Sequence, residues 1–83
     1  MRKIRDVKYV RDYILKIRFD NSKVKRVDLK DRVERLSSFQ GSIFKRLKRI
    51  DYFKKVRINP EIGTICWPNE ADFCPDVLYQ IGK

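Results

Sequence analysis

The feature that most constrains the fold is an alternation of apolar and charged side chains between residues 13 and 20. The apolar members are Tyr13, Leu15, Ile17 and Phe19, and the charged ones are Lys16, Arg18 and Asp20. Because successive side chains of a strand point to opposite faces, this period of two predicts a strand with one apolar and one charged face. Asp20-Asn21-Ser22 follows and predicts a short hairpin turn, since Asn tolerates the positive φ that such a turn needs.

The neighbouring segments extend this strand into a three-stranded antiparallel meander. Residues 4–10 predict a first strand, and Arg11-Asp12 predicts a tight turn after it. Residues 24–29 predict the return strand, in which the apolar period slips between Val24 and Val27. That slip indicates either a β-bulge or an edge strand. We expect one face of the meander to be buried and the other to be charged.

The apolar period then changes to that of helices. Leu29, Val33 and Leu36 fall at i, i+4 and i+7, which predicts a short helix whose N-terminus is served by Asp28 or Asp31. After a loop with Phe39 turned inward, a second and main helix is expected. The residues assigned to it are a capping Ser42 and an apolar stripe of Ile43, Phe44, Leu47 and Ile50. One further turn from Asp51 is expected to point Phe53 at the core.

The last third of the chain predicts a C-terminal β-hairpin and a short terminal helical turn. Val56 and Ile58 open a strand, Pro60 to Gly63 turn the chain, and residues 64–67 return. Pro75 followed by Asp76 suits the first turn of a helix.

These elements predict an α+β fold: a three-stranded antiparallel meander, one main helix packed on it, the hairpin and the terminal turn. Residues 1–83 are expected to form a single small domain, since 42% apolar residues suffice for one core. The predicted core residues are Val7, Leu15, Ile17, Phe19, Val27, Leu29, Leu36, Phe44, Leu47, Phe53, Val56, Ile58, Ile65, Trp67 and Leu78.

The charge of the chain is unevenly distributed. The net charge is +10, with residues 1–57 at +13 and residues 58–83 at −3. The candidate interaction or phosphate-binding residues are Lys45, Arg46, Lys48, Arg49, Lys54 and Lys55, with Arg57 and the neighbouring Lys23, Lys25 and Arg26 beside them. Such a field favours polyanions or an acidic protein, and the alternative is a basic surface that merely keeps the protein in solution.

Composition also bounds compartment and cofactors. We find no apolar run long enough for a membrane span, and charges interrupt residues 4–10, so no signal peptide is expected there. We therefore expect a cytoplasmic protein that does not engage a membrane. Cys66 and Cys74 are interpreted as small buried thiols rather than metal ligands, because the chain has no His and lacks close Cys pairs. No cofactor is expected.

Residues 63–79, which we call the signature segment, contain a distinctive set of residues: Ile65, Trp67, Pro68, Asn69, Asp72, Pro75, Asp76, Leu78 and Tyr79. Mainly through this set, the chain resembles domain-of-unknown-function family 2442, a group of small bacterial proteins. Ser22 departs from the glycine that the family usually has in the hairpin turn. The resemblance implies a compact α+β domain without an established catalytic activity, whose members often occur beside another small protein in toxin–antitoxin-like pairs.

The signature segment allows two interpretations. Trp67-Pro68-Asn69 either forms a recognition surface or fills the core, stops the strand and bonds the turn backbone, and the structural interpretation is favoured. Glu70, Asp72 and Asp76 form a conceivable acid–base set. Acid–base catalysis, however, needs a cleft that a domain this small has little material to build. Asp72 and Asp76 are instead expected to serve backbone N–H groups and a helix start.

The leading hypothesis is therefore a non-enzymatic interaction module, one component of a toxin–antitoxin-like pair, with a protein partner encoded nearby. The rival hypothesis is a nucleic-acid-binding accessory protein that uses the basic residues of positions 45–55. A homodimer formed through an exposed edge strand is a further option.

Overall fold

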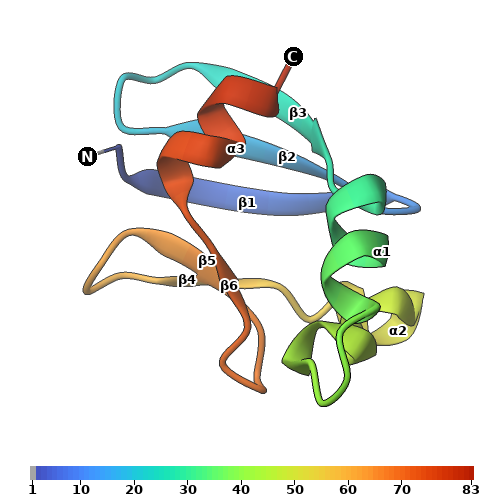
Figure 1. Ribbon diagram of the computed structural model, residues 1–83. Coiled ribbons are helices and arrows are strands. Elements are labelled where there is room, and N and C mark those ends of the chain that lie inside the picture. Colours follow the sequence, from blue (N-terminus) through green and yellow to red (C-terminus); the bar gives the residue numbers. More distant parts are fainter. Residues whose placement is uncertain (1) are drawn as a thin grey trace.

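The structure, a computed structural model, describes residues 2–83 and has the predicted α+β fold (Figure 1). Two three-stranded antiparallel sheets are joined by helical segments. The elements are β1 (Ile4–Arg11), β2 (Ile14–Phe19), β3 (Val24–Asp28), α1 (Lys30–Ser37), the 3₁₀ helix η1 (Ile43–Lys48), α2 (Ile50–Phe53), β4 (Arg57–Asn59), β5 (Thr64–Cys66), β6 (Asp72–Phe73) and α3 (Pro75–Ile81).

The first sheet is the predicted meander, in the order β1-β2-β3. Its β2–β3 turn differs in one detail from the expectation. The positive φ falls on Ser22, at 68°, while Asn21 contributes its side chain. The Asn21 Oδ1 accepts a hydrogen bond from the backbone N–H of Lys23 at 3.1 Å, which closes the turn.

The apolar slip in residues 24–29 reflects an edge strand and not a bulge. The register between β2 and β3 is unbroken, and the irregularities lie between β1 and β2 instead. Val24 is 48% exposed because it lies on the open face of the sheet. The chain end runs along this edge, where the Lys83 N–H donates to the Arg26 carbonyl at 2.9 Å. The chain itself thus partly occupies the β3 edge, one of the two edges of this sheet through which a homodimer would form.

The helical region confirms α1 but corrects the predicted main helix. Ser42 caps the segment as expected, its Oγ accepting the Phe44 N–H at 3.1 Å. The segment is nevertheless a 3₁₀ helix that ends at Lys48. Arg49, which has extended dihedral angles, separates it from the single turn of α2. Because a 3₁₀ helix has three residues per turn, a stripe spaced for an α-helix does not line up. Only Leu47 of η1 is buried.

The loop before η1 corrects a second expectation. Phe39 is 63% exposed and does not point into the core, and Ile43 is 48% exposed. Phe53 of α2, in contrast, is fully buried as predicted.

The second sheet contains the predicted C-terminal hairpin, β4–β5, and adds β6 as a third strand. Gly63 ends the hairpin turn with φ 68°, and a Cβ there would lie 2.8 Å from the Lys3 Cβ. This close approach lets the Ile4 N–H donate to the Gly63 carbonyl at 2.7 Å. The bond ties the first strand of one sheet to the other sheet. Figure 1 shows β1 beside β4, and α3 against β3.

Both sheets contribute to one hydrophobic core. Ten predicted core residues are buried: Leu15, Ile17, Phe19, Val27, Leu29, Leu47, Phe53, Ile65, Trp67 and Leu78. The other five pack against the core while partly exposed: Val7, Leu36, Phe44, Val56 and Ile58. The buried hydrophobic core also contains four residues outside the predicted core set: Ile4, Val33, Ala71 and Phe73.

Candidate interaction surfaces

Trp67 lies inside the protein and not on its surface. It is 1% exposed, and its ring centroid lies 5.6 Å from that of Phe53 and 5.8 Å from that of Phe73. Its indole Nε1–H donates to the Phe53 carbonyl at 2.9 Å. A buried indole N–H requires such a partner, so Trp67 both fills the core and fixes the end of α2.

Pro68 and Asn69 form the turn between β5 and β6. The Asn69 Oδ1 accepts the Ala71 N–H at 3.1 Å, and the Asn69 Nδ2 donates to the Ile43 carbonyl at 2.7 Å. Exposed Pro68 immediately precedes it. Asn69 therefore joins the signature segment to the start of η1, twenty-six residues earlier in the chain.

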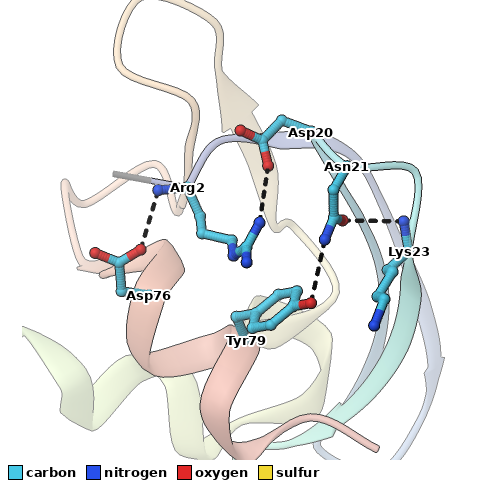
Figure 2. Close-up of polar contacts among 6 residues, drawn as sticks. All are labelled: Arg2, Asp20, Asn21, Lys23, Asp76 and Tyr79. Carbon is cyan, nitrogen blue, oxygen red and sulfur yellow. Dashed lines mark hydrogen bonds and ion pairs between the residues drawn. The ribbon is translucent and has the colours of Figure 1, made fainter.

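The carboxylates of the signature segment point to different places. Asp72 is exposed on β6, where it is paired in register with Cys66, and its side chain makes no hydrogen bond within residues 2–83. Asp76 instead accepts the Arg2 N–H at 3.0 Å (Figure 2). The capping role expected for Asp72 is thus not seen among the described residues. Glu70 occupies the β5–β6 turn with a positive φ of 70°.

A depression of about 220 Å³ adjoins Asp72, and Asp76 is not among its lining residues. It is lined by Thr64, Asp72, Phe73, Cys74 and Pro75. Both cysteines are free thiols; Cys66 is half-buried and Cys74 is exposed, which corrects the expectation of two buried thiols. Cys74 faces outward because its neighbours Phe73 and Pro75 take the buried positions on either side. Within residues 2–83 no three His, Cys, Asp or Glu side chains cluster in the manner of metal ligands.

Tyr79 is the centre of a polar cluster that holds both chain ends to the hairpin (Figure 2). The Arg2 guanidinium lies 4.0 Å from its ring centroid, and the Lys25 Nζ lies 3.9 Å from the same centroid. The Asn21 Nδ2 donates to the Tyr79 hydroxyl at 3.1 Å. The two cation–π contacts and the hydrogen bond to the hydroxyl stabilise the packing of α3 against the first sheet.

The same contacts change the acidity of the phenol. The hydrogen bond from Asn21 lowers the pKa of Tyr79, and the positive charge of Lys23 lowers it further. Arg2 and Lys25 act in the same direction. Asp20 balances part of this charge through its ion pair with Arg2, at 3.8 Å. Sequence reasoning missed this cluster, whose members lie in three separate parts of the chain.

The candidate basic residues of positions 45–55 are all exposed, on η1, between η1 and α2, and just after α2. They are Lys45, Arg46, Lys48, Arg49, Lys54 and Lys55. The backbone of this basic segment is tied to the first sheet, because the Tyr13 hydroxyl donates a hydrogen bond to the Lys48 carbonyl. Their partners are few: within residues 2–83 the group contains one ion pair, between Arg49 and Asp51 at 3.5 Å.

Three of these cations lie near aromatic rings. Arg46 and Lys55 lie 5.9 and 5.6 Å from the Tyr52 ring centroid, and Lys54 lies 5.6 Å from that of Tyr9. A depression of about 360 Å³ is lined by Arg46, Arg49, Asp51 and Tyr52. Cations already occupy the vicinity of Tyr52, which leaves its ring less open for stacking against a base.

The three basic residues of β3 and its preceding turn do not form one group. Lys25 is committed to Tyr79, because its Nζ also donates to the Tyr79 carbonyl at 2.9 Å. Lys23 lies at the hairpin turn beside Asn21. Arg26 is exposed and is paired in register with Lys16.

The fold and these surfaces define a small α+β domain with a structural C-terminal segment and exposed basic surfaces. The family described as protein of unknown function (DUF2442) matches residues 4–83. The chain therefore belongs to this family, as the signature segment indicated. No curated protein and no solved structure was found to match the chain. Among residues 2–83, no helix is both long enough and apolar enough to cross a membrane.

Proposed function

We propose that this protein is a non-enzymatic, cytoplasmic interaction module, one component of a toxin–antitoxin-like pair, that binds a protein partner encoded nearby. The observation that carries the proposal is the exposure of Phe39 and Ile43, at 63% and 48%. Aromatic side chains are enriched in protein interfaces, and the buried centre of an interface is more apolar than its rim. We call Phe39 and Ile43, with the adjacent Lys45 and Arg46, the anchor surface.

The backbone holds these two side chains outward. The Ser42 N–H donates to the Phe39 carbonyl at 3.1 Å, and Asn69 donates to the Ile43 carbonyl. Gly41 has φ 74° between them, which lets the chain turn sharply. A pre-organised loop loses less conformational entropy on binding than a mobile one. The exposure is thus a property of an ordered turn.

The chemistry of the surface indicates its partner. Lys45 and Arg46 follow directly on Ile43 and Phe44 and are both exposed. An apolar centre beside positive charge is complementary to a protein segment that carries apolar residues among acidic ones. Phosphate groups would use the charge but would leave Phe39 without a function. The anchor surface therefore favours protein over nucleic acid.

The test is co-expression with the product of the adjacent gene, followed by size-exclusion chromatography and light scattering. We expect a complex that survives nuclease treatment, and that is lost in the Phe39→Asp and Ile43→Asp variants. Ile62→Asp is the matched control, because Ile62 is also 48% exposed but lies in the β4–β5 turn. That control should retain the complex.

Three outcomes would overturn the proposal. They are separate elution of the two proteins, loss of the complex on nuclease treatment, and an Ile62→Asp variant that weakens it as much as Ile43→Asp. Circular dichroism melts of each variant distinguish a lost contact from a lost fold. A homodimer of the chain alone that depends on Phe39 would assign the anchor surface to a second copy instead.

A further inference from the structure

The outer face of the first sheet carries a row of three positive charges that packing does not explain. The strand register pairs Lys8 with Lys16, and Lys16 with Arg26. Residues paired in register project to the same face, with Cβ atoms about 5 Å apart. The three cations thus stand side by side across β1, β2 and β3, and all three are exposed. We call them the cation row.

Within residues 2–83 no member of the cation row forms an ion pair, although Asp6 lies beside the row, paired in register with Arg18. The two ion pairs in the described chain are Arg2–Asp20 and Arg49–Asp51. Like charges directly opposite one another destabilise a sheet. The row is therefore unfavourable for folding, in contrast to the opposite face, where Leu15, Ile17 and Val27 are fully buried.

The surroundings of the row fit phosphate groups. Arg18, two residues after Lys16, projects from the same face and is exposed. A depression of about 180 Å³ lies there, lined by Asp6, Lys8, Lys16, Arg18 and Val24. Val24, an exposed apolar residue on this face, offers no ring for a base to stack on. Phosphate contacts without stacking are typical of sequence-independent duplex binding.

We propose that the cation row, with Arg18, binds the phosphate backbone of duplex nucleic acid without sequence preference. An anionic backbone across the row would replace the repulsion between its members with attraction, and released counterions would drive the binding. This inference stands apart from the proposed function, since it uses none of the residues of the anchor surface. One molecule could hold a protein partner and a duplex at the same time.

The first test measures the affinity for a short labelled DNA duplex of mixed sequence by fluorescence anisotropy against salt. Four phosphate contacts predict a slope of log K on log salt of about −3.6, or a roughly 100-fold loss between roughly 50 and 200 mM salt. The triple variant Lys8→Gln/Lys16→Gln/Arg26→Gln should reduce that slope by roughly 2.7.

The matched control removes the same charge elsewhere, as Lys48→Gln/Lys54→Gln/Lys55→Gln. It should leave the slope unchanged, since these exposed lysines lie outside the first sheet. An equal reduction of the salt slope in both triple variants would mean that net charge alone attracts DNA, and would overturn the proposal. So would tighter binding to a single strand of the same length, or binding to phosphatidylserine-containing vesicles in preference to the duplex.

A second readout separates binding from a structural role. Lys16→Gln removes both repulsive pairs, so its Tm should rise by on the order of 1–3 °C while its duplex affinity falls. Lys16→Arg keeps the charge and should preserve the affinity. A lower Tm in Lys16→Gln, together with unchanged affinity, would assign Lys16 to the fold and contradict the inference.

Discussion

The two three-stranded sheets differ in how they use their side chains. The second sheet places Thr64, Ile65 and Phe73 in buried positions, and Trp67 follows its central strand into the core. The first sheet buries one face and leaves the other open to solvent, with like charges paired in register. The first sheet carries an arrangement that weakens folding, whereas the second contributes chiefly to the core.

This difference separates stability from recognition within one small domain. A chain of 83 residues has little stability to spare, so an unfavourable row of charges calls for a reason outside the fold. The signature segment supplies contacts that offset it, because Trp67, Asn69 and Tyr79 each connect distant parts of the chain. Substitutions in the second sheet and the signature segment should therefore act on folding, and those on the outer face of the first sheet on binding.

The largest effect is expected at Trp67. Trp67→Ala should lower the free energy of unfolding by about 3–5 kcal/mol, because it empties a fully packed site. Trp67→Phe keeps a ring but loses the hydrogen bond to the Phe53 carbonyl, and should lose about 1–3 kcal/mol. Urea denaturation followed by circular dichroism measures both. A Trp67→Ala protein as stable as the wild type would place Trp67 at a surface and contradict the comparison.

A moderate effect is expected at Asn69, which joins the signature segment to the start of η1. Asn69→Ala removes two hydrogen bonds and should lower the free energy of unfolding by about 1–2 kcal/mol. Asn69→Asp is the matched control, since its carboxylate still accepts the Ala71 N–H but cannot donate to the Ile43 carbonyl. Amide exchange at Ala71 should accelerate in the first variant and not in the second. Equal exchange in both would show that the Asn69 side chain does not hold this turn.

Much of the fold is predictable from local pattern. The alternation in residues 13–19 predicts β2 because the apolar period directly reports which face is buried. Pro75 and Asp76 predict the start of α3 for an equally local reason, as proline suits the first helical position. Where one apolar period dominates a segment, the sequence predicts both its secondary structure and its buried face.

The remaining features depend on contacts between distant residues. The apolar character of Phe39 predicts a buried side chain, but the direction of a loop side chain depends on contacts with distant residues. Near this loop, one such contact is the hydrogen bond from Asn69 to the Ile43 carbonyl. The Tyr79 cluster joins residues up to 77 positions apart, a separation that periodicity does not address. The cation row also escapes a reading by period alone. Counting residues outward from the β2–β3 turn gives the pairing of Lys16 with Arg26. The same count from the β1–β2 turn does not pair Lys8 with Lys16, because the register shifts between Tyr9 and Arg11.

The smallest effect concerns the hairpin turn of the first sheet, at Ser22. Its φ of 68° is unfavourable for a residue with a Cβ and natural for glycine. Ser22→Gly should therefore raise the free energy of unfolding by about 0.5–1 kcal/mol, with a higher denaturant midpoint and an unchanged m value.

Asn21→Gly is the contrasting variant, because it removes the side chain that accepts from Lys23 and donates to Tyr79. It should lower stability, and it should raise the pKa of Tyr79 toward its ordinary value, which ultraviolet titration of the phenol detects. The lowered pKa means that ionisation of Tyr79 favours the folded state, so this contribution to stability grows as pH rises through the folded pKa and is absent below it. A stabilising Asn21→Gly alongside a destabilising Ser22→Gly would reverse the roles of the two turn residues. That result would mean that the Asn21 side chain does not hold the first sheet to α3.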